Sequence, residues 1–499
     1  MKTNAIHPLR PQYHFTPEAN WLNDPNGMVY FEGEYHLFYQ HHPDSSVWGP
    51  MHWGHAVSKD LVHWEHLPIA LYPDHNGTIF SGSAVVDSND TSGFFGGEPG
   101  LVAVYTQTEM IPGSDASKQR QSIAYSKDKG RTWIPYPGNP VLEDERYPDF
   151  RDPKVFWHEQ TEQWIMVLAA GDRLFLYRSP NLIDWTFASE FGAEEGSHDG
   201  VWECPDLFEL PVEGGDGASK WVLIVSIGDN PSCPEGSRTQ YFIGEFDGLS
   251  FTNEHSADTV LWLDYGRDNY AGVTWSDAPG TESERLLIGW MNNWKYANQI
   301  PTVGWRGAMT LTRKLTLRQE REGVRLVQQL VDAIRQLRLS GSQWKDERIN
   351  ESRDLIVGQC GRQLELEAEF ELGTAAEFGI KLHAGGGQTV VGYDVRTGQL
   401  FIDRTESGIL DFHAEFGCRH GAPLEAKDRL IKLTLWLDRS SLEVFANDGG
   451  LVMTDQLFPL EGEDGLELYA VGGDVHLRSL RLYPLQSIYA TVAAEAAHG

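Results

Sequence analysis

The stretch SKDLVHW at residues 58–64 decides the fold, because variants of it recur along the first half of the chain. SKDKGRTW ends at Trp133, SPNLIDW ends at Trp185, and a weaker FDGLSF ends at Phe251. Each copy follows an apolar, strand-like run, such as GHAVS before the first and QSIAYS before the second. A strand, turn and aromatic unit repeated roughly every 50 to 70 residues is typical of propeller blades. The repeat favours a β-propeller over chance recurrence of common hairpin turns.

The second half of the chain has the pattern of a β-sandwich. RQLELEAEFELG and LIKLTLWLDRSSLEVFANDGG alternate polar and apolar residues, and the latter closes on Asn-Asp-Gly, a hairpin signal. Between the halves, GVRLVQQLVDAIRQLRLSG at 323–341 is predicted to be helix-like or a linker. We therefore expect an all-β chain divided into a propeller domain, a linker, a sandwich domain and a frayed tail, at residues 1–322, 323–341, 342–487 and 488–499.

The charge balance excludes some classes of partner. The chain has 499 residues, with 40 Lys and Arg against 72 Asp and Glu, which gives a net charge of −32. Such a chain repels phosphate backbones and anionic membranes, so we expect neither a nucleic-acid nor a membrane partner. The same acidity is compatible with an uncharged substrate.

The cysteines, the motifs and the N-terminal sequence limit which cofactors and which cellular compartment are expected for the chain. Cys204, Cys233, Cys360 and Cys418 lie far apart, with no CxxC pair, and are expected to be reduced, buried thiols. No metal site and no cofactor is expected, because no zinc spacing, dinucleotide loop or phosphate-binding loop is found. The first residues contain no apolar stretch of signal-peptide length, which predicts a cytoplasmic protein as written. A chain from which a signal had been trimmed would look the same, and would be secreted.

The run WLNDPNGMVYFEGEYHLFYQ at 21–40 places Asn, Asp, Pro and Gly between two aromatic, strand-like segments. Clusters of these residues are common in turns, where Gly supplies positive φ and the side chain of Asn or Asp hydrogen-bonds to the local backbone. The alternative is that the turn holds Asp24 as a reactive carboxylate at the mouth of a cleft. That interpretation needs partners elsewhere in the chain.

Two further acids occupy equivalent positions. FRDPKVFW places Asp152 just before an apolar run, and VWECPDLFEL places Glu203 likewise, each in a different expected blade. Because the innermost strand of every blade lines the central channel, residues remote in sequence converge there. Structural explanations exist for each acid alone: the proline after Asp152 favours extended backbone, and Glu203 is a candidate salt-bridge partner of Arg151. The coincidence of three such segments favours a shared site.

Paired carboxylates suffice to hydrolyse a glycosidic bond, one as nucleophile or base and the other as acid. Asp24 has Asn23 and turn amides nearby as donors, which favours its ionised form. Glu203 lies between Trp202 and Cys204, in more apolar surroundings that favour a protonated acid. The neighbouring residues therefore lean slightly toward Glu203 as the acid and Asp24 as the anion.

Six motifs together resemble glycoside hydrolase family 32, the invertases, levanases and exo-inulinases. They are WLNDPNG, FSGSAVV, FRDPKVF, WECPDLF, WGPMHWGHAVSKDLVHWEHLPIALYP and DRSSLEVFANDG. They extend from about Gln12 to about Leu485, so the resemblance covers both halves of the chain. Each motif alone is weak, whereas the ordered set is specific and is most similar to bacterial levanase-like enzymes.

The resemblance implies a five-bladed β-propeller followed by a C-terminal β-sandwich, and a retaining, exo-acting β-fructofuranosidase that forms a covalent fructosyl-enzyme. It assigns Asp24 as nucleophile, Glu203 as acid and then base, and Asp152 as a stabiliser that accepts hydrogen bonds from fructose hydroxyls. It implies that Asn26 supports the turn. A retaining pair is expected to lie ~5 to 5.5 Å apart, which predicts the separation of Asp24 and Glu203. The implied contacts to the fructosyl unit are Asn23, Gln40, Trp48, Phe80, Ser83, Arg151 and, as a wall, Trp290.

Several alternatives stay open on the sequence alone. The same site can transfer fructosyl units to sugar rather than to water. An inverting, arabinan-type propeller glycosidase is less favoured because of the NDPNG and ECPD motifs. A catalytically silent carbohydrate-binding protein is less favoured because all three acids are present. The substrate is not resolved among sucrose, inulin, levan and sucrose phosphate. The sandwich is equally open to glycan binding, to formation of a homodimer and to simple packing.

Overall fold

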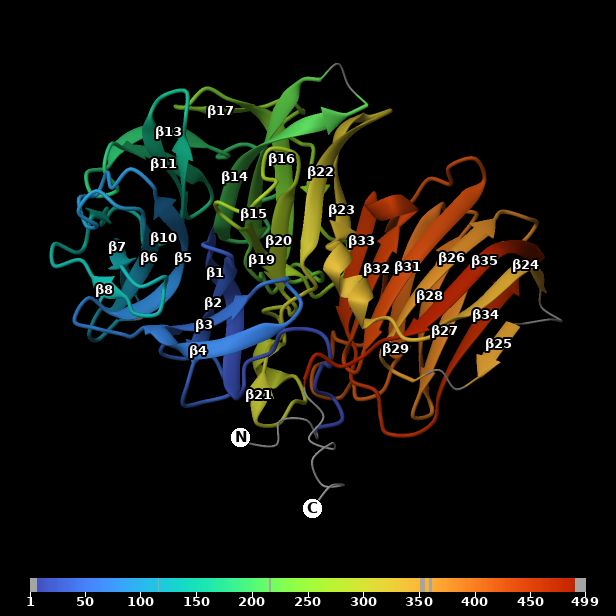
Figure 1. Cartoon of the computed structure of the whole chain (residues 1–499). Helices are drawn as coiled ribbons and strands as arrows, with labels where there is room; N and C mark the ends of the chain where they lie inside the picture. The colour runs from blue at the N-terminus through green and yellow to red at the C-terminus, as the bar shows by residue number, and fades with distance from the viewer. Residues whose placement is uncertain (1–6, 115, 215–216, 351–354, 359–360, 490–499) are drawn as a thin grey trace.

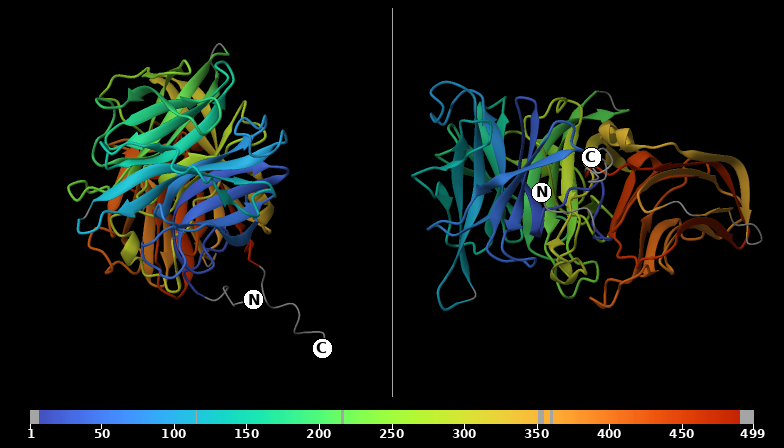
Figure 2. Two further views of the ribbon diagram at one scale, coloured as in Figure 1. Left: turned by 90° about the vertical axis from the view of Figure 1, so that its left-hand side faces the viewer. Right: turned by 60° about the horizontal axis from the view of Figure 1, so that its bottom comes forward.

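The computed structural model describes residues 7–114, 116–214, 217–350, 355–358 and 361–489, with the backbone alone for 355–358 (Figure 1). The described residues are nearly all β, with three short 3-10 helices. They form two lobes that lie side by side, one from each half of the chain (Figure 2). Cys360 and residues 490–499 of the expected tail lie outside the described residues.

The N-terminal lobe begins with three blades of antiparallel strands. The first blade consists of β1 (Asn20–Phe31), β2 (Glu34–His42), β3 (His52–Ser58) and β4 (Trp64–Leu71), with β21 (Trp305–Arg306) added in parallel to β1. The second consists of β5 (Thr78–Asp87), β6 (Gly100–Met110), β7 (Ser117–Ser126), β8 (Ile134–Pro135) and β9 (Leu142–Glu143). The third consists of β10 (Phe150–His158), β11 (Gln163–Ala170), β12 (Leu174–Ser179) and β13 (Thr186–Phe191).

Two more blades complete the lobe, which confirms the five-bladed propeller. The fourth blade consists of β14 (Trp202–Glu213), β15 (Ser219–Ile227), β16 (Arg238–Phe246), β17 (Phe251–Asn253) and β18 (Leu261–Trp262). The fifth consists of β19 (Tyr270–Thr274), β20 (Arg285–Trp290), β22 (Arg313–Glu320) and β23 (Gly323–Leu330), with 3-10 helix η1 (Ala297–Gln299) in a connection. The ends of β14 and β22 pair in parallel, so the last two blades form one continuous sheet.

The repeated turn joins the third and fourth strands of a blade. In the first copy, the Ser58 hydroxyl accepts the backbone N–H of Leu61, and Asp60 accepts that of His63. Asp128 and Asn181 accept equivalent backbone bonds in the second and third copies. Short polar side chains therefore satisfy the turn amides, which is the physical reason for the recurring Ser-x-Asp/Asn pattern.

Strands β1, β5, β10, β14 and β19 contact one another in cyclic order and line the central channel. The pairing register of each shifts part-way along, at a β-bulge. In the last three of these strands the bulge places Asp152, Cys204 and Ala271 at φ of 66°, 47° and 53°. Bulges re-aim side chains and are frequent beside active sites. The channel wall is thus irregular at the same level in every blade.

The run Asn-Asp-Pro-Asn-Gly is not a turn between strands. It lies inside the single strand β1, where the register shifts between Leu22 and Pro25 and again between Asn26 and Val29. Gly27 has φ of 53° and packs so closely on Trp53 that a Cβ atom would come within 2.5 Å of the ring. The turn-forming residues therefore serve to bend an inner strand rather than to reverse the chain.

The segment 323–341 differs from the helix-like or linker expectation. Its first part is β23, which pairs along its whole length with β22, from Arg313 opposite Leu330 to Glu320 opposite Gly323. Only η2 (Asp332–Leu337) is helical. The apolar spacing of this segment fits both a helix and a half-buried strand, and pairing with the exposed edge of β22 selects the strand.

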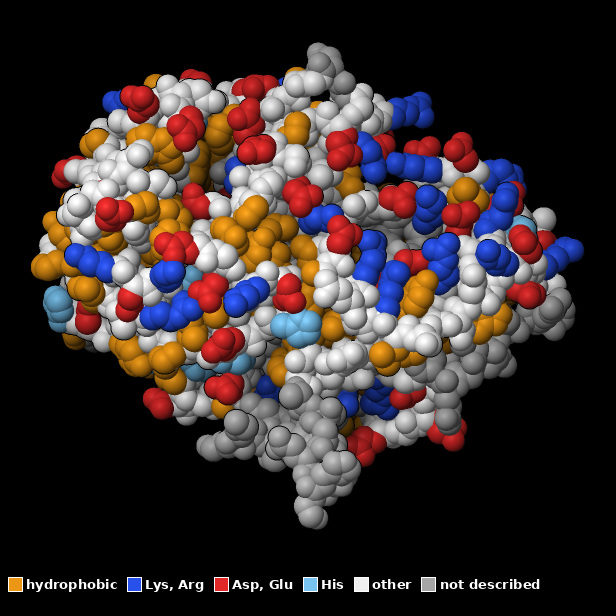
Figure 3. Space-filling model, viewed as in Figure 1, with side chains coloured by type: hydrophobic (Ala, Val, Ile, Leu, Met, Phe, Trp, Pro, Cys, Tyr) orange, Lys and Arg blue, Asp and Glu red, His pale blue; other side chains and the backbone are white. Residues whose placement is uncertain are grey.

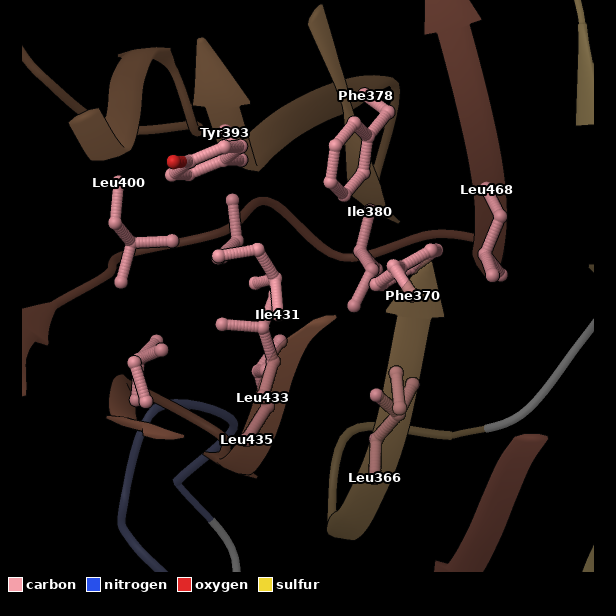
Figure 4. Close-up of a cluster of buried hydrophobic side chains, with 14 of the residues drawn as sticks. Leu366, Phe370, Phe378, Ile380, Tyr393, Leu400, Ile431, Leu433, Leu435 and Leu468 are labelled. Carbon is pink, nitrogen blue, oxygen red and sulfur yellow. The ribbon is translucent and has the colours of Figure 1, made fainter. Parts of the chain in front are cut away.

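The C-terminal lobe is a sandwich of two six-stranded sheets, as expected. One contains β24 (Ser342–Asn350), β35 (Asp474–Pro484), β26 (Leu364–Glu371), β31 (Leu430–Asp438), β32 (Ser441–Ala446) and β33 (Leu451–Gln456), with η3 (Asn447–Gly449) between the last two. The other contains β25 (Leu355–Gly358), β34 (Asp464–Val471), β27 (Glu377–Ala384), β28 (Gly387–Asp394), β29 (Gln399–Glu406) and β30 (Arg419–Pro423). Figure 4 shows apolar side chains from both sheets, among them Leu366, Ile380 and Leu433, packed between the layers.

Buried ion pairs join the two lobes. Arg313 of β22 is fully buried and contacts Asp264 at 3.0 Å and Glu443 of the sandwich at 2.7 Å. His14 lies between Glu443 at 3.0 Å and Asp438 at 2.8 Å. Asp438 and Glu443 are two of the three acids of the DRSSLEVFANDG motif. That motif therefore attaches the sandwich to the propeller.

A second buried group lies beside the first. Arg404 of β29 contacts Asp268 at 2.6 Å and Asp455 at 3.1 Å, and Asp455 also contacts His420 at 3.0 Å. The Tyr296 hydroxyl donates to Asp268 at 2.6 Å. Asp268 and Tyr296 come from the propeller half, and the other three residues come from the sandwich.

The two ends of the described chain meet at the same junction. The backbone N–H of Gln12 donates to both carboxylate oxygens of Asp438, at 2.9 and 2.8 Å. The N–H of Ile488 donates to the Gln12 carbonyl at 2.9 Å, and the Tyr489 hydroxyl donates to the His14 carbonyl at 2.9 Å. The first two residues of the expected tail are therefore hydrogen-bonded in the structure.

Candidate active site

Each inner strand contributes one polar group near its start to a common cluster. These groups are Asp24 of β1, Ser81 of β5, Asp152 of β10, Glu203 of β14 and Tyr270 of β19. Hydrogen bonds, which the next paragraphs give, connect them across the blades. The three acids singled out from the sequence are thus brought together at one mouth of the channel.

Asp24 is buried and hydrogen-bonded on both oxygens. Its Oδ2 accepts the Ser81 hydroxyl at 2.7 Å, and its Oδ1 accepts the Asn23 amide at 3.0 Å. The Asn23 Oδ1 in turn accepts the Trp21 indole N–H at 2.7 Å, which fixes the amide orientation. Asp24 is held in place by donors, with 9% of its surface exposed.

Asp152 lies beside Asp24, with one sulfur atom between them. The Cys204 Sγ is 3.5 Å from Asp152 Oδ2 and 3.6 Å from Asp24 Oδ2, and the Cys204 backbone N–H donates to Asp152 at 3.0 Å. Burial raises the pKa of the Cys204 thiol well above its ordinary value, so the sulfur stays protonated. It can then donate to either carboxylate.

Glu203 is the most open of the three acids, with 22% of its side chain exposed. Its Oε1 accepts Arg151 Nε at 3.2 Å and Nη2 at 3.0 Å, and its Oε2 accepts the Tyr270 hydroxyl. Burial raises the pKa of Tyr270 well above its ordinary value, so this hydroxyl stays a donor. Arg151 also donates to Asp149 and, at 3.3 Å, to Gln119.

The electrostatics differ from the expectation drawn from neighbouring residues. Burial raises the pKa of Asp24, and repulsion from Glu203 adds to this, although Ser81 and Asn23 donate to it. Burial also raises the pKa of Asp152; Arg151 opposes that shift, and the charges of Glu203 and Asp24 add to it. The arginine pairs with Glu203 rather than with Asp24. Asp24 is therefore not the easily ionised acid that its donors suggested.

The other predicted contacts surround this cluster in different ways. The Gln40 amide donates to Asn26 at 2.9 Å, and Asn26 donates to the Pro25 carbonyl at 2.9 Å. Trp48 is 46% exposed, and its ring meets Phe80 edge-on at 6.2 Å between centroids. Trp48 and Phe80 thus present aromatic surface, whereas Gln40 supports the bend of β1.

Two predicted contacts lie elsewhere than expected. The Ser83 hydroxyl donates to the Pro153 carbonyl at 2.8 Å and accepts the Val155 N–H at 2.9 Å, so it joins two blades; Ser81 is the serine beside Asp24. Trp290 has no exposed surface and packs behind the site on Trp21, at 5.9 Å between ring centroids. Neither Ser83 nor Trp290 is therefore placed to touch a substrate.

Tyr270 and Ser81 are site residues that sequence reasoning missed. Tyr270 opens β19 and is fully buried against the cluster, where it bonds Glu203. The available signal is positional: the fifth inner strand should supply one residue at the level where the others supply their acids. Ser81 lies two residues before Ser83, in the same FSGSAVV motif.

Over the ranges that the structure describes, no group of three or more His, Cys, Asp or Glu side chains is arranged to hold a metal ion. Within those same ranges, no helix has the length and apolar character needed to cross a membrane.

Comparison with known families accounts for nearly the whole chain. The model of the glycosyl hydrolases family 32 N-terminal domain matches residues 14–329, and that of the family 32 C-terminal domain matches residues 331–484. A levanase of Bacillus subtilis (strain 168) is 56% identical over 97% of this chain and 71% of its own length. A levanase of Bacillus sp. (strain L7) is 42% identical over 96% of this chain and 52% of its own length.

Solved structures of related enzymes superpose on both lobes. The crystal structure of exo-inulinase from Aspergillus awamori has a TM-score of 0.88 at 37% identity, covering 97% of this chain and 100% of that one. Fructofuranosidase from Schwanniomyces occidentalis, complexed with fructose, has a TM-score of 0.87 at 33% identity, covering 98% and 100%. By the match of both family models over almost its full length, this chain belongs to glycosyl hydrolase family 32.

Proposed function

We propose that this chain is a retaining, exo-acting β-fructofuranosidase that hydrolyses terminal β-D-fructofuranosyl residues of sucrose, inulin or levan. The observation that carries the proposal is the convergence of Asp24, Asp152 and Glu203 from three blades at one mouth of the channel. The names of the relatives, levanase, exo-inulinase and fructofuranosidase, support a fructoside as substrate.

In the proposed reaction, an Asp24 carboxylate oxygen attacks the anomeric carbon of fructose while Glu203 gives its proton to the leaving oxygen. The bond to the leaving sugar breaks as the fructosyl-enzyme forms. Glu203, now an anion, takes a proton from water, and the resulting hydroxide displaces Asp24. The Arg151 ion pair stabilises the anionic form of Glu203 between the two steps. The pair is expected to lie ~5 to 5.5 Å apart.

Asp152 is proposed to bind rather than to react. Its carboxylate is held by the Cys204 N–H and is available to accept hydrogen bonds from fructose hydroxyls. Positive charge develops on the sugar ring in the transition state, and a fixed carboxylate in a buried site stabilises that charge. We propose Asn23, Gln40, Trp48, Phe80 and Arg151 as the surrounding contacts, with Ser81 in place of Ser83.

A product chromatogram tests the proposal directly. The purified chain is incubated in parallel with sucrose, inulin, levan and sucrose phosphate, with Asp24→Asn as the matched inactive control. Free fructose from at least one substrate supports the proposal and ranks the substrates. Longer oligosaccharides at high sucrose indicate transfer to sugar instead, and no product from any of the four substrates contradicts the proposal.

The stereochemical outcome is tested separately. NMR follows which anomer of fructose is released first. Retention of configuration requires this to be the β form. Initial release of the α form indicates direct attack by water and contradicts Asp24 as nucleophile, since inverting enzymes keep their carboxylates farther apart.

Because β23 belongs to the fifth blade, we propose that the propeller extends to residue 330, followed by a connection at 331–341 and a sandwich from 342. The cellular location and a homodimer also stay proposals. One relative is named extracellular exo-inulinase, from Aspergillus niger, at 39% identity over 94% of this chain. The substrate ranking bears on location as well, because levan and inulin are polymers whereas sucrose phosphate is a metabolite of the cell interior.

A further inference from the structure

A cavity of about 410 Å³ lies at the opposite mouth of the propeller channel from the three acids. Its walls come from the later residues of the same inner strands, such as His158 of β10, six residues after Asp152. At about 3.3 Å per strand residue, this places the His158 wall of the cavity roughly 20 Å from Asp152, while the inner wall at Lys154 lies nearer. Figure 3 shows a hollow in the propeller lobe close to where Figure 1 labels β14.

The channel between the two mouths is closed. Lys154 is buried in it and donates to the Thr274 carbonyl at 2.6 Å, and it contacts Asp206 at 3.1 Å. The space left beside Lys154 on the side of the acids is about 10 Å³, enough for about one water molecule. A molecule in the cavity therefore enters from its own side and does not reach the acids through the channel.

Aromatic rings and polar groups line the cavity together. Phe156 and Trp157 are half-buried in its wall. Arg285 stacks over Phe208 at 5.5 Å, its Nε is buried without a partner, and among the described residues none accepts a hydrogen bond from its guanidinium group. The rim consists of exposed loop residues that follow the inner strands, among them Asn89. A volume of this size is typical of sites for small molecules.

The charges of the lining indicate which ligand fits. Its acids outnumber its cations: among the described residues, Lys154 and Arg285 face five acids, namely Asp87, Glu159, Asp206, Glu209 and Asp277. An anionic ligand is therefore repelled. An apolar ligand would leave the polar lining without hydrogen bonds, at a cost in free energy. A neutral molecule with many hydroxyl groups, and ring faces that stack on aromatic side chains, satisfies both kinds of wall.

We propose that this distal cavity is a second saccharide site, which binds a segment of fructan chain at a distance from the acids. The inference rests on the proposed function for the chemical identity of the saccharide. A polymer held at the distal site raises the local concentration of fructan ends around the enzyme, as in other multivalent binding. The site is expected to matter for polymers and not for sucrose.

The test counts binding sites by calorimetry on the full chain. Asp24→Asn serves as the background, so that substrate is not consumed, and nystose and levantriose are the probes, each used separately. Two sites per chain are expected with at least one probe. Arg285→Met and Thr281→Trp, the second of which fills the cavity from an exposed loop, should each reduce the count to one. Arg178→Met, an exposed arginine on the third blade, removes the same charge and should leave two sites.

Each outcome is decisive. A single site in the Asp24→Asn chain, unchanged by Arg285→Met and Thr281→Trp, overturns the distal site and leaves the proposed function standing. No binding of either probe overturns both. In the active enzyme, Thr281→Trp should raise KM for levan at least about threefold without changing kcat on sucrose. Equal changes on levan and sucrose would show a structural effect and would also overturn the proposal.

Discussion

Two buried clusters of carboxylates in this molecule are neutralised to very different degrees. At the junction of the lobes, five acids share four cationic side chains, namely Asp264, Asp268, Asp438, Glu443 and Asp455 with His14, Arg313, Arg404 and His420. At the channel mouth, three acids share a single cation among the described residues, Arg151, which also pairs with Asp149. Uncompensated buried charge is costly, so the first cluster fits attachment and the second fits chemistry.

The pKa shifts of two junction acids, Glu443 and Asp455, follow the same division. Although burial acts to raise it, Arg313 and His14 hold the pKa of Glu443 below its ordinary value. At the channel mouth, burial and neighbouring acids raise the pKa of both Asp24 and Asp152. At the junction, against the effect of burial, cations also hold the pKa of Asp455 below its ordinary value, whereas burial raises that of Asp268 although Arg404 opposes the shift. The division therefore holds for Glu443 and Asp455 and not for Asp268.

The largest expected effect is the loss of activity in Asp24→Asn, which changes the channel-mouth cluster of acids. The amide keeps the size of the side chain but is a poor nucleophile, so kcat is expected to fall on the order of 10⁴-fold. Fructose release measures the loss, and Asp411→Asn, in an exposed loop, is the control that should stay active. Substantial activity in Asp24→Asn would show that another residue attacks.

Arg313→Met is expected to destabilise the junction of the two lobes most strongly. This leaves Asp264 and Glu443 buried with fewer partners, and loss of one member of a buried ion pair costs about 3–5 kcal/mol. Urea unfolding should show the loss, whereas Lys314→Met, whose partner Asp332 is 71% exposed, should cost under about 1 kcal/mol. If the two variants were equally stable, the junction would not depend on its charges.

A third prediction uses the pH dependence of the junction. Although burial acts to lower it, Asp438 and Glu443 raise the pKa of His14 to about 9, from an ordinary 6.5. The resulting stability is fully present below pH 6.5 and is lost as the pH rises through about 9, a change of about 3 kcal/mol.

Urea midpoints at pH 6 and pH 9.5 measure this effect. His14→Gln should flatten the dependence, and His75→Gln, whose side chain is 85% exposed, should not. His420, whose pKa is likewise raised to about 9 by Asp455 against the effect of burial, accounts for the slope that remains. An unchanged slope in His14→Gln would mean that His14 is neutral in the folded chain.

The smallest expected effect is on the stability of the channel-mouth cluster and is produced by Asp152→Asn. Asp152→Asn removes one charge from an under-neutralised cluster and should stabilise the chain by roughly 1–3 kcal/mol at pH 7.5 while lowering activity. Because the pKa of Asp152 is raised in the folded state, the parent gains stability as the pH falls, and the difference should shrink at pH 4.5. Exposed Asp258→Asn is the control, and a less stable Asp152→Asn would contradict the prediction.

The acids of the site were predictable because position along a repeat carries the information. Asp24, Asp152 and Glu203 each precede an apolar run in a different blade, and the structure brings them together. Residues at bulges were not predictable in the same way. Period-two alternation fails between Ile79 and Gly82, so the sequence does not show which of Ser81 and Ser83 faces Asp24.

Other differences have physical reasons as well. Trp290 matched a motif, but burial depends on what packs over a ring, here Trp21 and Trp294. The apolar spacing of β23 fits a helix as well as a strand, and pairing with the edge of β22 selects the strand. The sequence indicates Arg151 as a partner of Glu203, whereas the contact of Tyr270 with Glu203 forms only when the fifth blade closes the ring.

The hydrogen bonds of Gln12 to Asp438 and Ile488 set an order of events on the ribosome. Gln12 is synthesised early, yet its partners emerge more than four hundred residues later. A nascent chain can stack its blades before then, and Phe15 can already pack on Tyr39 and Trp64, but Gln12 still lacks its partners. Completion of the fold thus waits for the last strand of the sandwich, after which Ile488 reaches Gln12.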